Sequence, residues 1–239
     1  MENENMRFFA DRFEAGTELA SHLQHKTNKD LIVLALPRGG VPVGFEIAKA
    51  LGAPLDIFLV RKLGVPGHEE LAMGAITSNG ARFLNPDVLD QIMIPQSAID
   101  RVADSELREI RRREDTYRRG ANALDIRNKD VILVDDGLAT GSTMIAALRA
   151  VNAEEPRTVT VAVPVAPPSI YEDLKGEADE IICLQTPEPF WGVGQWYDDF
   201  SQLTDQEVLD LLGRAKAQAE SQRIGYVPPM RKEESIDGQ

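Results

Sequence analysis

The sequence predicts an α/β fold with a central, mostly parallel sheet and helices on both faces. Three observations support this prediction. Several short runs are apolar throughout, stretches with helical spacing lie between them, and glycine or proline stands at many of the boundaries. A strand that is apolar on both sides is buried on both faces, as in a parallel sheet covered by crossover helices.

The first quarter of the chain contains two predicted strands. Its apolar residues first recur at helical spacing and predict an amphipathic helix: Met6, Phe9, Phe13, Ala20 and Leu23. The run LIVLAL (31–36) predicts a buried strand, and VPVGFEIAKALG (41–52) predicts a helix that ends at a glycine. LDIFLV (55–60) predicts a second buried strand. The stretch 61–71 contains two glycines and a proline, and we expect a long loop there.

The rest of the chain continues the alternation. Asn79-Gly80 lies between two strand-like runs and predicts a hairpin. A polar, arginine-rich helix is expected over 95–119, and a further helix over 141–151. Three more apolar runs predict the remaining strands, at 131–134, 158–165 and 180–184.

Length and composition indicate one domain. The 239 residues are expected to form a single domain over 1–225, with a small hood lobe built from about 63–120 and 185–205, and a polar tail over 226–239. The net charge of -13 opposes binding to nucleic acid. Uncharged apolar runs such as 31–37 are too short to span a membrane. The polar start lacks a secretory signal and Cys183 is the single cysteine, so we expect a cytoplasmic protein with a buried thiol.

The stretch VILVDDGLATGSTM (131–144) carries the chemistry. A buried strand is followed by Asp135 and Asp136, and then by small residues at the start of a helix. Backbone N–H groups and hydroxyls over 139–143 would bind a phosphate monoester, assisted by the helix dipole. The carboxylate pair suits vicinal hydroxyls and a Mg²⁺ ion shared with other oxygen ligands. A sugar phosphate satisfies both halves of the motif.

The acid pair followed by ATGST resembles the phosphoribosyl pyrophosphate signature of type I phosphoribosyltransferases, and VDDGLATG is especially similar to the adenine-type version. The chain looks like a bacterial branch of that family. The resemblance implies Mg²⁺-dependent transfer of a phosphoribosyl group from phosphoribosyl pyrophosphate to a nitrogenous base. It also implies that Asp135 and Asp136 bind the ribose hydroxyls. The residues implied to bind the 5-phosphate are Ala139, Thr140, Gly141, Ser142 and Thr143.

LPRGG (36–40) is similar to the pyrophosphate loop of the family, so the resemblance implies that Arg38 and the Gly39 N–H face pyrophosphate. It further implies a cis peptide bond before Arg38. Arg61 and Lys62 match basic positions near pyrophosphate, and 63–76 corresponds to a flexible loop that closes over the site. The residues implied to be catalytic are Asp135, Asp136, Arg38 and Lys62. We expect a side chain at Gly141 to block phosphate binding and leave the fold intact.

The base site departs from the pattern of the hypoxanthine-guanine enzymes. Ala139 stands where those enzymes carry an acid, and VPVAPPSI (163–170) lacks their lysine for the 6-oxo group. PFWGVGQWYDDF (189–200) resembles their base-covering segment, which implies that Trp191 stacks on the base and that Asp198 lies nearby. The alternative is that both tryptophans only anchor this segment on the core.

Other interpretations remain open at this point. The fold could serve a regulator that binds phosphoribosyl pyrophosphate or a nucleotide without turnover, or a receiver-like phosphate-binding module. The late position of the acid pair argues against the receiver-like module. The three histidines lack metal-ligand spacing. The arginine-rich helix is expected to be a solvated face with i,i+4 ion pairs, and a subunit contact in a homodimer is the alternative.

Overall fold

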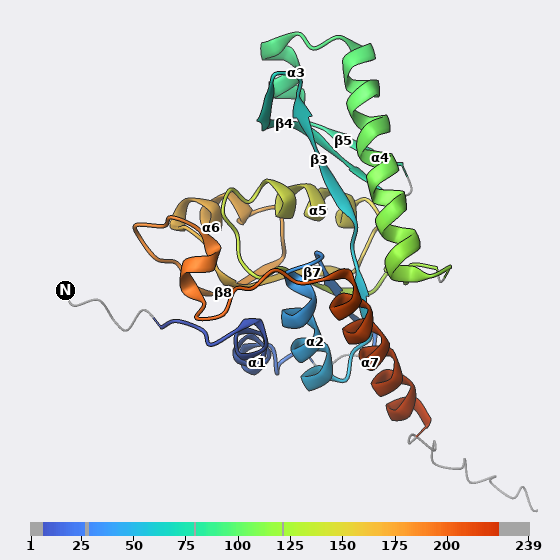
Figure 1. Ribbon diagram of the computed structural model, residues 1–239, viewed down its shortest axis with the longest axis vertical. Helices are drawn as coiled ribbons and strands as arrows, with labels where there is room; N and C mark the ends of the chain where they lie inside the picture. The colour runs from blue at the N-terminus through green and yellow to red at the C-terminus, as the bar shows by residue number, and fades with distance from the viewer. Residues whose placement is uncertain (1–6, 27–28, 79, 121, 225–239) are drawn as a thin grey trace, which may run out of the picture.

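The protein contains two sheets that occupy different parts of the molecule (Figure 1). The computed structural model describes residues 7–26, 29–78, 80–120 and 122–224. A five-stranded sheet forms the larger part, and a three-stranded sheet forms a lobe that projects from it. The predicted α/β class with a parallel central sheet is confirmed.

The larger sheet has the strand order β2-β1-β6-β7-β8, and every neighbouring pair in it is parallel. Each predicted apolar run contributes one strand: β1 (Leu31–Ala35), β2 (Leu55–Ile57), β6 (Asp130–Val134), β7 (Thr158–Val165) and β8 (Glu180–Gln185). The strand β1 is buried at all five positions, which explains its unbroken apolar sequence.

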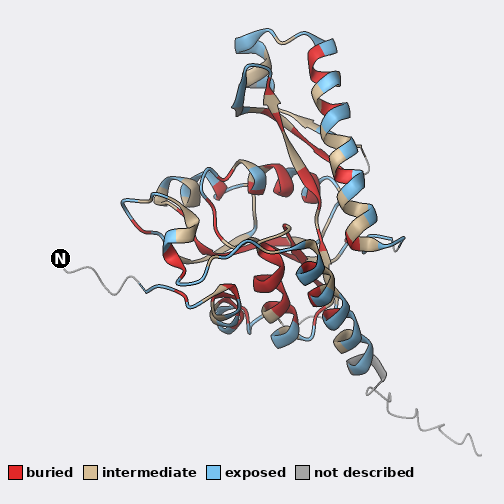
Figure 2. Ribbon diagram, in the orientation of Figure 1, coloured by how far each residue is buried: buried red, intermediate tan, exposed pale blue. Residues whose placement is uncertain are grey.

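Helices cover both faces of this sheet (Figure 1). On one face lie α1 (Arg12–His22) and α2 (Gly40–Leu51), whose apolar side chains pack against Ile132 and Val134 of β6. On the other face lie α5 (Ser142–Asn152) and α6 (Pro168–Leu174). The long helix α7 (Asp205–Ile224) packs against α2 and β2. The buried residues concentrate between these layers (Figure 2).

The smaller lobe is an antiparallel sheet covered by helices. Its strands are β3 (Val60–Val65), β4 (His68–Thr77) and β5 (Arg82–Leu84), in that order. The helices α3 (Pro86–Ile92) and α4 (Gln96–Arg118) complete it, and the buried face of α4 packs on β3 and β4. The hairpin predicted at Asn79-Gly80 joins β4 to β5, with Asn79 itself outside the described residues.

The predicted loop over 61–71 is wrong. The segment 63–76, expected to be a flexible loop that closes over the site, forms a hairpin, and its closure stays a prediction. These residues form the β3–β4 hairpin, and the predicted strand 55–60 is divided between β2 and β3. Gly64 lies at a register shift, where a Cβ would come within 2.7 Å of the Glu69 carbonyl oxygen. Gly67 has a positive φ of 81° in the turn. The two glycines therefore belong to a bulge and a tight turn.

The first helix begins later than the apolar spacing predicts. It begins at Arg12, and the N-cap Asp11 side chain accepts hydrogen bonds from the backbone N–H groups of Phe13 and Glu14 at 2.8 Å each. Phe9 lies before the helix and forms a bridge with Tyr197. Met6 and the predicted tail over 226–239 lie outside the described residues.

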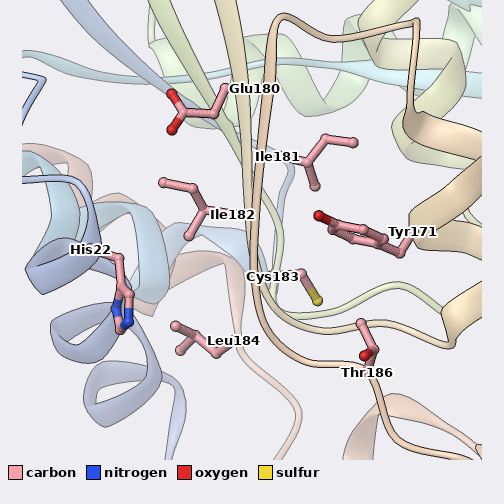
Figure 3. A pocket seen from close by; sticks show the side chains of 8 residues that line it. All are labelled: His22, Tyr171, Glu180, Ile181, Ile182, Cys183, Leu184 and Thr186. Atoms are coloured by element: carbon pink, nitrogen blue, oxygen red, sulfur yellow. The ribbon is translucent and has the colours of Figure 1, made fainter.

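The outer strand β8 forms one edge of the larger sheet. His22 of α1 and Tyr171 of α6 flank it on opposite faces, around a hollow of about 580 Å³ (Figure 3). Cys183 is half-buried in this strand, and its Sγ donates to the carbonyl oxygen of Gln185 at 3.2 Å. Burial raises the pKa of the Cys183 thiol to about 11. None of the described helices combines the length and apolar character needed to cross a membrane.

Cys183 is expected to react slowly with thiol reagents in the folded protein. An unperturbed cysteine has a pKa of about 8.5, so a pKa near 11 lowers the thiolate fraction at pH 8 by about two orders of magnitude. The rate of alkylation by iodoacetamide at pH 8 measures this effect, with the same chain in denaturant as the control. Equal rates for the folded and unfolded chains would contradict the prediction.

Candidate functional site

The strand order brings two predicted motifs together. After β1 the chain continues to β2, which lies on one side of β1, whereas β6 lies on the other side. The carboxyl ends of β1 and β6 therefore form a topological switch point. The backbone N–H of Leu36 donates to the carbonyl oxygen of Val134 at 2.9 Å. The LPRGG segment therefore leaves the sheet beside Asp135 and Asp136.

Gly39 lies directly against the acid pair. A methyl group on its Cα would overlap the Asp136 carboxylate, and a Cβ on Gly40 would come within 2.7 Å of the Val134 carbonyl oxygen. Only residues without a side chain allow this approach of the β1–α2 turn to the end of β6. The peptide bond between Pro37 and Arg38 is cis, as expected.

The acid pair is buried, and its members have different surroundings. Burial raises the pKa of Asp135 well above its usual range, and the neighbouring charge of Asp136 raises it further. Burial also raises the pKa of Asp136, but the guanidinium of Arg12 opposes this effect. The pKa of Asp135 is therefore raised more strongly than that of Asp136, whose charged form Arg12 favours.

Arg12 is a site residue that motif analysis missed. Its Nε donates to Asp136 Oδ2 at 2.7 Å, and its Nη1 donates to the backbone oxygen of Ser201 at 3.0 Å. Arg12 stands in the buried stripe of α1, at helical spacing with Ala15 and Leu19. A charged residue within an otherwise small and apolar stripe is the sequence signal that could have identified it.

The segment after β6 turns tightly into α5. Gly141 is the N-cap of α5 with a φ of 67°, and Ala139, Thr140 and Thr143 are exposed around it. The N-terminal backbone N–H groups of α5 are thus open to an anion. A Cβ at Gly141 would come within 2.6 Å of Ile170 Cγ2, so a side chain there would disturb the turn itself. The expectation that a side chain at Gly141 leaves the fold intact stays a prediction, and the positive φ and the close approach of Ile170 make this position strained.

A cleft of about 750 Å³ lies between the two lobes. Its lining includes Pro37 of the β1–α2 turn, Lys62 of β3 and Thr143 of α5. Three predicted segments therefore meet at one cavity. Arg61 also lines this cavity, and its Nε donates to Glu106 Oε2 at 2.6 Å. Arg38 faces α7, with Nη1 at 3.8 Å from Asp205 Oδ1.

The two tryptophans of the predicted base-covering segment have different environments. Trp196 is 7% exposed and its ring stacks between Phe8 and Phe190, so it anchors the core. Trp191 is 78% exposed and packs into no such cluster. Asp198 is exposed, and its backbone N–H donates to the carbonyl oxygen of Phe9 at 2.8 Å. The alternative that both tryptophans only anchor this segment on the core therefore fits Trp196 but not Trp191.

The segment carrying Trp191 passes close to the acid pair. A Cβ on Gly137 would come within 2.5 Å of Val193 Cγ1, and the hydroxyl of Tyr197 donates to the carbonyl oxygen of Asp136 at 2.6 Å. The short 3-10 helix η1 (Val193–Trp196) therefore lies beside the turn that follows β6.

Residues 10–200 match the model of a known family, the phosphoribosyl transferase domain. The chain belongs to this family. The sequence resemblance is thereby confirmed at the level of the family. The match covers the larger sheet, the smaller lobe and every candidate site residue described above.

Relatives of this chain are found among both sequences and solved structures. Two Mycobacterium tuberculosis proteins, provisionally named as phosphoribosyl transferases, are each 44% identical over 96% of the chain. The chain spans about half the length of these curated relatives, 52% of each. The crystal structure of a Thermus thermophilus protein, TT1426, is 44% identical with a TM-score of 0.79, covering 86% of this chain and 97% of that one.

The donor set at the end of β6 would fit a magnesium ion that is shared with a substrate. Among the residues that the structure describes, no group of three histidine, cysteine or acidic side chains could hold a metal alone. Mg²⁺ is commonly bound through one or two carboxylates together with substrate phosphates. One carboxylate oxygen of each acid already has a hydrogen-bond partner. Oδ2 of Asp136 accepts from Arg12 Nε, and Oδ1 of Asp135 accepts from the backbone N–H of Asp136 at 2.9 Å.

Gly39→Ala is expected to destabilise the protein by about 1–3 kcal/mol, because the new methyl group must displace a carboxylate that Arg12 holds in place. Gly213→Ala in α7 is the matched control. A Cβ there meets nothing within 4 Å, and alanine should stabilise the helix by roughly 0.5–1 kcal/mol. Urea denaturation measures both changes. Equal stabilities of the Gly39→Ala variant and the wild type would show that Gly39 does not press on Asp136.

Proposed function

We propose that the protein transfers a phosphoribosyl group from phosphoribosyl pyrophosphate to a nitrogenous base and releases pyrophosphate, with Mg²⁺ as cofactor. One observation carries the proposal: the Gly39 turn lies against Asp136 at the switch point, beside the open N-terminus of α5. A glycine turn, an acid pair and a helix N-terminus match the pyrophosphate, ribose and 5-phosphate of one ligand.

The reaction is a displacement at the anomeric carbon of ribose. The bond from this carbon to pyrophosphate breaks, its electron pair leaves with pyrophosphate, and a ring nitrogen of the base forms the new bond and loses its proton. Arg38, Lys62 and the Gly39 N–H stabilise the charge that develops on the leaving group. When bound, Mg²⁺ neutralises part of the pyrophosphate charge and orients it. Arg61 adds positive charge at the same cleft.

The acid pair and the α5 turn hold the sugar. Asp135 and Asp136 accept hydrogen bonds from the ribose hydroxyls, and Asp135 contributes a Mg²⁺ ligand. Residues 139–143 bind the 5-phosphate through their backbone N–H groups and the hydroxyls of Thr140, Ser142 and Thr143. The β3–β4 hairpin carries Lys62 and moves over the bound substrate, which excludes water from the activated sugar.

Trp191 supplies the stacking surface for the base. Its exposure of 78% leaves a ring face open for this purpose, and the segment that carries it lies beside the acid pair. Asp198 is the nearby polar group. Because Ala139 replaces an acid and 163–170 contains no lysine, the acceptor is a base without the 6-oxo group of hypoxanthine and guanine. Cytoplasmic location and a homodimer remain predictions.

A regulator that binds phosphoribosyl pyrophosphate without turnover is the second candidate function. A sensor needs the phosphate site but no cation for a leaving group, and Lys62 of the β3–β4 hairpin lines the cleft. This observation favours the enzyme.

Incubation with labelled phosphoribosyl pyrophosphate, Mg²⁺ and a panel of bases is expected to yield a nucleoside monophosphate and pyrophosphate. Lys62→Gln should slow product formation by about 10- to 100-fold, because one hydrogen bond to a charged group is lost. Chromatography of the label measures the product.

Calorimetric titration with phosphoribosyl pyrophosphate, with and without Mg²⁺, measures binding separately from turnover. Binding without any product would support the sensor, and absence of binding would overturn both functions.

Base binding is expected to change the fluorescence of Trp191. In a Trp196→Phe background Trp191 is the single tryptophan, and phenylalanine preserves the aromatic stack between Phe8 and Phe190. Bases are titrated with pyrophosphate and Mg²⁺ present. Stacking should quench the emission, and Trp191→Ala should weaken base binding by about 1–3 kcal/mol. Unchanged emission together with full activity of Trp191→Ala would place the base elsewhere.

A further inference from the structure

Arg12 is a charged residue on the buried side of α1. The buried positions of this helix recur at helical spacing: Arg12, Ala15, Gly16, Leu19 and Ala20. The Arg12 side chain is 11% exposed. An arginine is almost never this deeply buried unless it is paired, so its partners indicate what the position serves.

The contacts of Arg12 converge on the candidate site. Nε donates to Asp136 Oδ2 at 2.7 Å, Nη1 donates to the backbone oxygen of Ser201 at 3.0 Å, and the guanidinium carbon lies 3.9 Å from the ring centre of Phe200. The planar guanidinium of Arg12 therefore contacts both Asp136 at the end of β6 and the segment that follows η1.

Asp136 is fixed at both of its polar ends. The carboxylate is held by Arg12, and the carbonyl oxygen accepts the hydroxyl of Tyr197 at 2.6 Å. The same carboxylate fills the space beside the Cα of Gly39. Its orientation therefore determines how closely the Gly39 turn can approach the end of β6.

We infer that Arg12 is a positioning residue for phosphoribosyl pyrophosphate, because it fixes the Asp136 carboxylate against the Gly39 turn and so sets the shape of the ribose and pyrophosphate subsites. The inference rests on the proposed function of this site. Arg12 acts through Asp136 and does not itself contact the ligand. Through Ser201 and Phe200 it also couples the acid pair to the segment that carries Trp191.

A second arginine of the chain provides a matched control. Arg118 of α4 pairs with Asp56 of β2, the edge strand of the larger sheet, and its other polar contacts are with Ile57 and Glu114 rather than with the acid pair. The N–O distance is 2.7 Å in both ion pairs. The side chains of Arg12 and Asp136 are 11% and 14% exposed, and those of Arg118 and Asp56 are 9% and 14% exposed. Loss of either arginine removes the cationic partner of a largely buried carboxylate, and Asp56 keeps its hydrogen bonds from the backbone N–H groups of Ile57 and Leu124.

The experiment compares Arg12→Gln with Arg118→Gln in the full chain. Both variants should unfold at lower temperature than the wild type, because each loses a buried ion pair. Calorimetric titration with phosphoribosyl pyrophosphate and Mg²⁺ should show at least a tenfold weaker affinity for Arg12→Gln and an unchanged affinity for Arg118→Gln. Arg12→Lys keeps the charge but loses the planar fork, and should recover part of the affinity.

A double variant separates positioning from direct contact and also covers the case in which Arg12→Gln does not fold. Arg12→Gln/Asp136→Asn removes both charges of this ion pair, so position 136 is not left as a carboxylate without its cationic partner. If Arg12 acts through Asp136, the double variant should bind with the same affinity as Asp136→Asn alone. A further loss beyond Asp136→Asn would show that Arg12 contacts the ligand and would overturn the inference.

The remaining outcomes distinguish the inference from the proposed function. Equal losses of affinity in Arg12→Gln and Arg118→Gln would show that Arg12 serves stability alone, and the proposed function would stand without it. An unchanged affinity in Arg12→Gln would overturn the inference in the same way. Absence of binding in the wild type would overturn the proposed function, and the inference with it.

Discussion

The site depends on one close contact, in which the Cα of Gly39 lies against the carboxylate of Asp136. This contact requires β1 and β6 to be neighbours and to end at the same level, and the parallel register of the pair provides both conditions. It also requires a turn without side chains between β1 and α2. The order of the strands, the two glycines of LPRGG and the second acid of the motif are thus parts of one geometrical arrangement.

The sequence predicts the larger sheet because parallel strands buried on both faces leave an unambiguous pattern. The smaller lobe was only partly predictable. Gly64 and Gly67 indicated a loop over 61–71, but they form a bulge and a turn within a hairpin. A glycine signals special backbone geometry, and the same residue serves loops, bulges and turns. Which of these it serves depends on the partner strand, which the local sequence does not specify.

At the site, the residues contributed by one continuous motif were predictable and those that act from a distance were not. The strand, acid pair and glycine turn of 131–144 follow one another in the sequence and in space. Arg12 lies 124 positions before its partner Asp136, so no local pattern connects the two. The two tryptophans were likewise not separable by sequence. Their difference in exposure arises from the stacking of Trp196 on Phe8 and Phe190.

The helix α4 also links the two parts of the molecule. Its 23 residues extend for about 34 Å along the smaller lobe, and polar contacts hold its C-terminal end on the larger part. There Arg118 pairs with Asp56, and the hydroxyl of Tyr117 donates to Asp205 at 2.5 Å. Asp205 also lies 3.8 Å from Arg38 of the β1–α2 turn. The anchorage of the lobe therefore reaches this turn through an acidic side chain that does not itself line the cleft.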